Sequence, residues 1–314
     1  MNTDVLTPVT QAMRDGTLTR RELKQLMRRS DRPALLRLLV WCVIVATGII
    51  AIWLAQGSWL IVPAMFFHGV VLVHHFSLQH ECCHYTAFKT RWLNDVVGNV
   101  CGLIIMLPNR FFRYEHCDHH TYTQIKGKDT ELIEMPQSKS EYLWYISSVP
   151  YWKAKLGELW RHALGNMTFE EKRFVPVSER RMVILEARCM AGFYAAVIIL
   201  GIVYQSDAAL WFWFLPVVLG EPVMRAIRMT EHVGRPMVGD MTTNTRSNRI
   251  SGPLKFLCWN MNYHAEHHYA ASVRFHALPA LSEKLDGYVH TEKDGYFGAH
   301  RDIVRQLFAH EHRR

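Results

Sequence analysis

The sequence has little charge in four of its segments. Charged residues make up 20% of the 314 positions, yet apart from one glutamate they are missing from four apolar runs, at 38–55, 59–76, 190–204 and 208–224. Runs of about 17 to 20 apolar residues match the thickness of a bilayer's hydrocarbon core. The shortest run, 190–204, can span the core only if flanking residues extend it or the bilayer is locally thinner. Buried core helices are the alternative. Two tightly linked pairs of runs in one chain favour membrane spans.

Two further absences limit the chemistry. The seven cysteines include no C-x-x-C pair, so neither a disulfide framework nor a four-cysteine iron–sulfur site is expected. The first apolar run begins near residue 38, which is too far from the start, and the run is too long, for a cleaved signal peptide. No fused haem segment of the cytochrome b5 type is visible either. Any electron donor is therefore expected to be a separate protein.

Lysine and arginine are missing from the linkers inside each pair of runs, "QGS" (56–58) and "QSD" (205–207). The N-terminal segment, the stretch 109–189 and the chain after 225 are rich in both. The positive-inside rule then places both termini and the middle stretch on the cytosolic side of the membrane. If the protein is bacterial, this membrane is the inner membrane. The net charge of +8 follows this bias, and nucleic-acid binding is not expected.

These observations predict an all-α integral membrane protein with four transmembrane helices in two hairpins. A shorter apolar segment, 96–107, is too short to span and predicts a re-entrant or interfacial helix. A cytosolic helical cap, 109–187 and 227–285, is expected to carry the functional site. The predicted spans are about 35–56, 59–77, 188–205 and 208–226. They lie in a membrane domain (34–285), which a cytosolic N-terminal segment (1–33) precedes and a basic C-terminal tail (286–314) follows.

Three histidine-rich motifs follow apolar segments or lie on the same predicted side: "HECCH" (80–84), "HCDHH" (116–120) and "HAEHH" (264–268). Helix positions i, i+3 and i+4 share a face, whereas adjacent positions diverge by about 100° and can reach two different ions. Imidazole suits iron, zinc, copper or nickel. The predicted metal ligands from these motifs are His80, His84, His116, His119, His120, His264, His267 and His268.

The first motif alone also fits the H-E-x-x-H pattern of zinc proteases. A catalytic zinc uses three protein ligands and an open water position, so eight histidines are too many for it. An intramembrane zinc protease stays as a remote alternative, as does a non-enzymatic metal- or haem-binding membrane protein. Two metals of higher coordination number fit the eight histidines better.

These residues resemble the membrane fatty acid desaturase family and its hydroxylase relatives. "HECCHYTAF" is similar to the first box of the omega-6-like acyl-lipid branch. "YEHCDHHTYTQ" with "DTEL" (129–132) resembles the second box, and "WNMNYHAEHH" with "FHALPAL" (275–281) resembles the third. The resemblance covers roughly residues 35 to 285. Cys83, Thr130 and the segment after His268 depart from common forms of the boxes, which leaves the substrate class open.

The resemblance implies a di-iron oxidoreductase that uses two iron ions (Fe²⁺/Fe³⁺), dioxygen and external electrons to desaturate a lipid acyl chain. Hydroxylation of a lipid or other apolar substrate by the same site is the alternative. The expected partners are a ferredoxin, rubredoxin or cytochrome b5-type donor with its reductase, and a membrane lipid or lipid-linked substrate. His232 is the candidate for a ninth ligand, because relatives place an additional histidine between the last span and the third box.

Other side chains beside the boxes are candidates for supporting roles. Carboxylates that accept the second imidazole N–H fix the orientation of a ligand. Asn262 is a candidate for contact with a metal-bound water, and His74 and His75 are expected to form ordinary hydrogen bonds instead of binding metal. The candidate supporting carboxylates are Glu81, Glu115, Asp118, Glu231 and Glu266.

Overall fold

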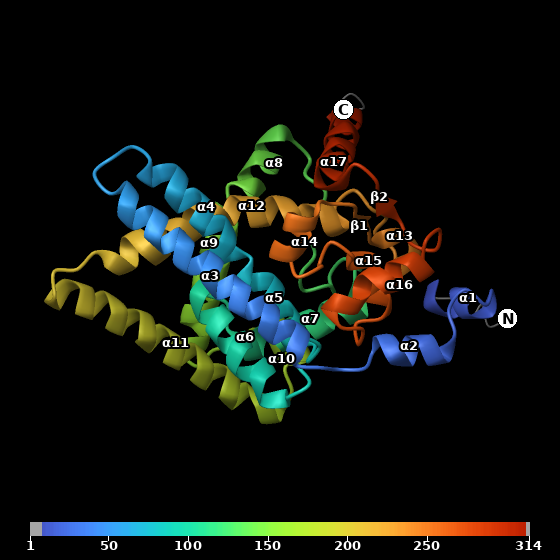
Figure 1. Ribbon diagram of the computed structural model, residues 1–314, viewed down its shortest axis with the longest axis horizontal. Coiled ribbons are helices and arrows are strands. Elements are labelled where there is room, and N and C mark those ends of the chain that lie inside the picture. Colours follow the sequence, from blue (N-terminus) through green and yellow to red (C-terminus); the bar gives the residue numbers. More distant parts are fainter. Residues whose placement is uncertain (1–7, 312–314) are drawn as a thin grey trace.

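The computed structural model describes residues 8–311 and is almost entirely helical. Four helical stretches are long and apolar enough to cross a membrane, as the sequence predicts. They are α3 (Arg32–Ala55), α4 (Ile61–Val73) continued by α5 (His75–Cys83), α11 (Val177–Val203), and the π-helical η1 (Leu210–Phe214) continued by α12 (Leu215–His232). The prediction of four spans is therefore confirmed (Figure 1).

These helices expose apolar side chains on their outer faces. On α3, Leu39, Val43 and Leu54 are 65%, 60% and 70% exposed. In water such a surface would be unfavourable, whereas hydrocarbon chains of lipid cover it without cost. The exposure supports a lipid-facing position for α3.

Three predicted spans differ from the observed helices at their ends. The second stretch continues past residue 77 to Cys83, with a break at His74, so the first histidine box lies on the helix itself. The third begins at Val177 instead of 188, and the fourth runs on to His232. These helices continue through polar residues because other parts of the protein supply hydrogen-bond and ion-pair partners for the polar side chains. Hydropathy alone does not reveal such partners.

The short apolar segment predicted as re-entrant forms half of a bent pair. Helix α6 (Arg91–Ile105) meets α7 (Asn109–Tyr122) at an angle of 96°. Met106 ends α6 in the left-handed conformation with φ of 60°, and the backbone N–H of Leu107 then donates to the carbonyl of Gly102. The side-chain amide of Gln79 on α5 donates to the carbonyl of Leu107 over 2.8 Å. The bend is thus attached to the helix of the first box.

Glycines bring α4 and α12 into close contact. A Cβ atom on Gly220 would lie 2.3 Å from the carbonyl carbon of Gly69, and one on Gly69 would lie 1.9 Å from the carbonyl oxygen of Pro216. The two backbones therefore touch without side chains between them. This contact fixes α12, which carries His232, against the helix that leads to the first box.

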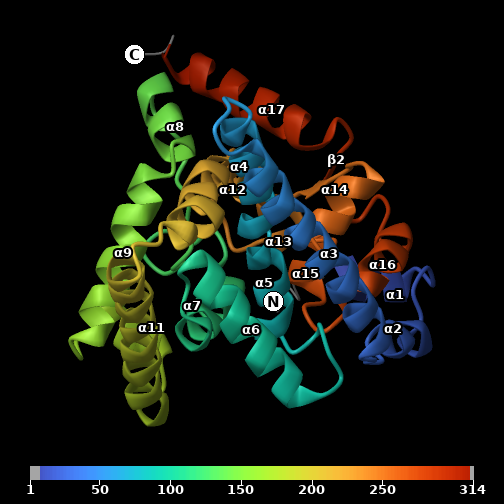
Figure 2. The same cartoon turned by 60° about the vertical axis from the view of Figure 1, so that its left-hand side comes forward.

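Of the remaining elements, α13 to α16 gather in a cap between the centre and the right of Figure 1. The N-terminal helices pack on this cap, with Lys284 paired to Glu22 over 2.9 Å. Helix α17 lies beside α8, where Tyr142 contacts His300 over 2.9 Å (Figure 2). The elements are α1 (Pro8–Arg14), α2 (Arg20–Leu26), α8 (Lys139–Ile146), α9 (Val149–Ala163), α10 (Phe169–Phe174), α13 (Met241–Asn244), β1 (Ser247–Asn248), α14 (Gly252–Leu257), α15 (His264–Tyr269), η2 (Phe275–Ala277), α16 (Leu278–Lys284), β2 (Thr291–Glu292) and α17 (Gly295–Glu311). The strands β1 and β2 pair in parallel.

The predicted division into three segments at residues 33 and 285 stays a prediction. Its outermost residues, 1–7 and 312–314, lie outside the described part of the chain.

Candidate metal centre

Four helices bring nine histidines together. The first box lies on α5 and its C-cap, the second on α7, and the third on α15, while His232 is the last residue of α12. The spacing i, i+3, i+4 places the histidines of α7 and α15 on inward faces. All eight predicted box histidines and the predicted ninth, His232, lie in this assembly.

The nine side chains divide into two groups, within each of which one ring nitrogen per histidine lies within 4.8 Å of the others. Adjacent residues are split between the groups: His120 and His267 belong to one, His119 and His268 to the other. This division follows from the angle of about 100° between neighbouring helix positions. The first cluster is His80, His84, His116, His120 and His267; the second cluster is His119, His232, His264 and His268.

The ring nitrogens converge in a manner that fits a metal ion. In the second cluster the Nε2 atom of His264 lies 2.9 Å from that of His232 and 3.0 Å from that of His268. In the first, Nε2 of His267 lies 3.2 Å from that of His84 and 3.1 Å from that of His120. A ring nitrogen of a neutral imidazole carries either one N–H or one lone pair, so a single Nε2 atom cannot form two separate hydrogen bonds to such neighbours. Lone pairs that converge on one point suit a shared cation.

Unpartnered nitrogens give the same indication. The Nε2 atoms of His80 and His119 are buried and have no hydrogen-bond partner among residues 8–311. Buried polar atoms normally have hydrogen-bond partners, and a site that binds an ion is one reason for an exception. Each cluster therefore contains a nitrogen that is free to bind a metal.

Burial favours the neutral form of several of these imidazoles. Desolvation lowers the pKa of His84 from 6.5 to about 3 and holds the pKa values of His264, His267 and His268 well below 6.5. Metal binding requires the neutral imidazole. At neutral pH these ligands need not lose a proton before they bind.

Two carboxylates that the sequence analysis did not assign contact the histidines directly. Oε1 of Glu131 lies 2.7 Å from Nδ1 of His116, and Oδ1 of Asp129 lies 2.7 Å from Nδ1 of His119. Since a carboxylate accepts, each Nδ1 donates and each Nε2 is left with its lone pair. Both acids belong to the "DTEL" segment, so the resemblance of that segment to the family pattern was the available signal.

The five predicted supporting carboxylates have different partners. Glu115 pairs with Lys155 over 2.9 Å, and Asp118 pairs with Arg173 over 2.6 Å. Glu231 and Glu81 approach the Nδ1 atoms of His264 and His80 only to 3.7 Å. Glu81 also accepts from Thr86, and Glu266 accepts from Ser247. Their supporting roles stay predictions.

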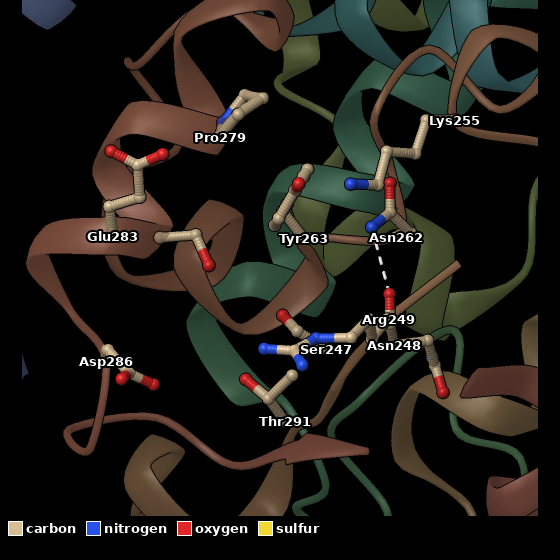
Figure 3. A pocket seen from close by; sticks show the side chains of 11 residues that line it. Ser247, Asn248, Arg249, Lys255, Asn262, Tyr263, Pro279, Glu283, Asp286 and Thr291 are labelled. Carbon is tan, nitrogen blue, oxygen red and sulfur yellow. Dashed lines mark hydrogen bonds between the residues drawn. The ribbon is translucent and has the colours of Figure 1, made fainter. Parts of the chain in front are cut away.

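Asn262 faces a different partner from the one expected. Its side-chain amide donates to the backbone carbonyl of Asn248 over 2.9 Å, at the wall of a cavity of about 380 Å³ (Figure 3). The backbone N–H of Asn248 donates to the carbonyl of Asn262 in return. Asn262 thus connects β1 to the segment before the third box, and its contact with a metal-bound water stays a prediction.

The two histidines left off the ligand set lie outside both clusters. His75 accepts from Nε1 of Trp41 over 3.1 Å, and its Nδ1 donates to the carbonyl of Leu72 over 2.8 Å. Nδ1 of His74 lies 2.6 Å from the carbonyl of Val70. Both therefore make hydrogen bonds within the helical bundle.

A smaller cavity, of about 120 Å³, lies beside the first cluster. Phe76 and Phe112 line it and also contact the histidines: the ring of Phe112 stacks on His116 with centroids 5.3 Å apart. Glu131 and Arg228 form part of its polar wall. The cavity thus reaches residues that contact the first cluster.

Comparison with known proteins identifies the family. Residues 57–299 match the family model "Fatty acid desaturase". Similar proteins include the sn-1 oleoyl-lipid 12-desaturase of Arthrospira platensis (23% identical, over 83% of this chain and 80% of that protein) and that of Anabaena variabilis (23%, over 86% and 82%). The chloroplastic omega-6 fatty acid desaturase of Spinacia oleracea is 22% identical over 84% of this chain, which spans 61% of the plant protein. The chain belongs to the fatty acid desaturase family and is an integral membrane enzyme of that family.

Proposed function

We propose that this enzyme holds two iron ions and uses dioxygen and two external electrons to desaturate an acyl chain of a membrane lipid. The observation that carries the proposal is the pair of adjacent, buried clusters of five and four histidines. An all-imidazole set accommodates iron, and two clusters exceed what a single catalytic zinc uses. The similar cyanobacterial proteins, named as desaturases of oleoyl lipids, support the acyl-lipid substrate.

Iron bound in the clusters would supply the dioxygen chemistry that attacks an unactivated C–H bond, which protein side chains do not perform by themselves. The protein's own residues hold the site in place. Glu131 and Asp129 orient His116 and His119, and burial favours the neutral form of His264, His267 and His268. Phe76 and Phe112 cover one side of the first cluster with apolar rings, which limits the access of water.

We further propose that the centre faces the cytosol and receives electrons from a separate carrier such as a ferredoxin, a rubredoxin or a cytochrome b5-type protein. The linkers 56–58 and 205–207 lack lysine and arginine, which favours their position on the opposite side. The exposed residues Lys89 and Arg91 follow the first box and give that side a basic character suited to an acidic carrier, whereas Arg110 and Arg113 are paired with Glu179 and Asp95.

The first experiment is metal analysis of protein purified anaerobically in detergent, with wild type and His84→Ala compared. About two irons per chain in the wild type, reduced in the variant, are expected from the two clusters. One zinc and little iron per chain, with exchange during purification excluded, would contradict the proposal.

Product analysis separates the two possible reactions. Wild-type enzyme supplied with dioxygen, a reductase-coupled donor and phospholipid is expected to give an alkene in the acyl chain. An alcohol as the main product would show hydroxylation by the same centre, and the absence of both products from every acyl lipid supplied would contradict the lipid substrate.

A further inference from the structure

One arginine connects carboxylates that face different histidine clusters. Arg228 on α12 places one terminal guanidinium nitrogen 2.5 Å from Oε2 of Glu131 and the other 2.5 Å from Oε2 of Glu231. The opposite oxygen of Glu131 binds His116 of the first cluster. The opposite oxygen of Glu231 lies 3.7 Å from Nδ1 of His264 of the second cluster. We propose that Arg228 is a positioning residue that couples the geometry of the two metal sites.

The bridge is enclosed by protein. Arg228 is 5% exposed and Glu231 is 3% exposed. A charge in such surroundings is stable only if it is paired and hydrogen-bonded, so none of the three side chains can move away without leaving an uncompensated charge. The position of each carboxylate is consequently tied to that of the other.

The shape of the guanidinium makes this connection rigid. Arginine presents its N–H groups in a fixed planar fork, whereas lysine is a point charge on a flexible stem. Because the two carboxylates bind different nitrogens of one plane, the fork sets their separation and relative angle. A displacement of Glu131 is thereby transmitted to Glu231, and from there toward His264.

A neighbouring arginine on the same helix supplies a comparison. Arg225, one turn earlier, binds Glu221 through Nε over 2.6 Å and lies 3.8 Å from the centre of the Tyr151 ring. It is buried and paired to a similar degree, with 8% exposure. Glu221, however, contacts no histidine of either cluster in any interaction found among the described residues. Arg225→Lys is therefore the matched control for Arg228→Lys.

The inference rests on the clusters binding metal, as proposed above, and is tested with Co²⁺ titrated into metal-free protein in detergent. The absorption spectrum of bound Co²⁺ and the affinity of each step are measured. Arg228→Lys keeps the positive charge and removes the planar guanidinium. We expect this change to weaken both Co²⁺-binding steps by about tenfold or more, which is the range found when hydrogen-bond partners of ligating histidines are removed. Arg225→Lys is expected to bind as the wild type does. Two wild-type-like steps in a folded Arg228→Lys protein, or weakening of one step alone, would overturn the inference.

A second measurement remains informative if Arg228→Lys does not fold. The background for this measurement has His84, His120 and His267 all changed to alanine, which leaves only two of the five histidines of the first cluster. In that background, Glu131→Gln is compared with the unchanged Glu131. Coupling through Arg228 predicts a weaker Co²⁺ affinity and an altered spectrum at the second cluster, although Glu131 contacts the first. Identical affinity and spectrum would overturn the coupling while leaving metal binding intact. Failure of the wild type to bind Co²⁺ or iron would instead overturn the metal centre itself, together with this inference.

Discussion

Nδ1 of His119 donates a hydrogen bond of 2.7 Å to Oδ1 of Asp129, and both side chains are about 1% exposed. The same carboxylate accepts from the backbone N–H groups of Gln124 and Glu131. Asp129 therefore connects the loop after the second box to a histidine of the second cluster. Its geometry is that of a carboxylate that fixes the tautomer of a metal-binding histidine.

Replacement of Asp129 is expected to weaken the second metal site. Asp129→Ala removes the hydrogen-bond acceptor for His119 and should lower the Co²⁺ affinity of the second cluster by about 10- to 100-fold. Asp129→Asn should lower it less, because the amide keeps an acceptor oxygen. The affinity is measured by titration in a background with His84, His120 and His267 changed to alanine, where the second cluster is the one that keeps all its histidines. Asp118→Asn is the control, since Asp118 pairs with Arg173 and not with a histidine. Wild-type affinity in Asp129→Ala would contradict the prediction.

A methyl group at Gly220 is expected to destabilise the protein. The added Cβ would lie 2.3 Å from the carbonyl carbon of Gly69, so α4 and α12 must separate. Overpacking of this kind costs about 1 to 3 kcal/mol. Thermal unfolding in detergent should show a lower midpoint for Gly220→Ala, together with lower iron content because α12 carries His232.

Gly192→Ala on α11 is the control for this change. A Cβ there meets no heavy atom within 4 Å among the described residues, and alanine favours the helix more than glycine does. Its midpoint should equal or exceed that of the wild type. Equal midpoints for Gly220→Ala and the wild type would show that the two helices separate without cost.

His75 is expected to contribute to stability and not to metal binding. His75→Phe removes the acceptor for the buried indole N–H of Trp41, which should cost about 1 to 3 kcal/mol of unfolding free energy. Iron per chain should equal that of the wild type in the folded fraction. A loss of iron comparable to that of His84→Ala would place His75 among the ligands after all.

The ion pair between Arg161 and Glu171 predicts a pH-dependent contribution to stability. Burial by itself would raise the pKa of Glu171, but hydrogen bonds from His162 and Arg161 outweigh it and lower the pKa from 4.5 to about 2. Because the folded state holds the carboxylate ionised, its contribution is complete above pH 4.5 and is lost as the pH falls toward 2. The unfolding midpoint of the wild type should therefore exceed that of Glu171→Gln near neutral pH.

This difference should shrink between pH 4.5 and 2. Thermal unfolding of both proteins is followed across that range, with Glu170→Gln as a neighbouring control outside the pair. A difference that stays constant with pH would mean that Glu171 acts through packing and not through its charge.

The membrane architecture and the residue types of the candidate metal centre could be predicted from local features of the chain. Long uncharged runs can be stable as spans because lipid replaces water around them, and this property is local to each run. The i, i+3, i+4 spacing of His116, His119 and His120 is likewise local, since a helix turns by a fixed angle at each residue. Both features could be predicted without knowledge of the fold, and the family resemblance of the boxes gave their order and chemistry.

Which histidines meet, and which side chains hold them in place, depends on the packing of the folded chain. The grouping of His120 with His84 and His267, and the approach of His232 to His264 over 2.9 Å, depend on how α5, α7, α12 and α15 pack. The contacts of Glu131 and Asp129 with ring nitrogens, and the pairing of Glu115 with Lys155 instead of a histidine, depend on the direction of each side chain in the folded chain. Buried charges must find partners across elements that are distant in sequence, and no local pattern specifies which partner lies within reach. The bridge from Glu131 through Arg228 to Glu231 is therefore a property of the fold, although each of its residues is plain in the sequence.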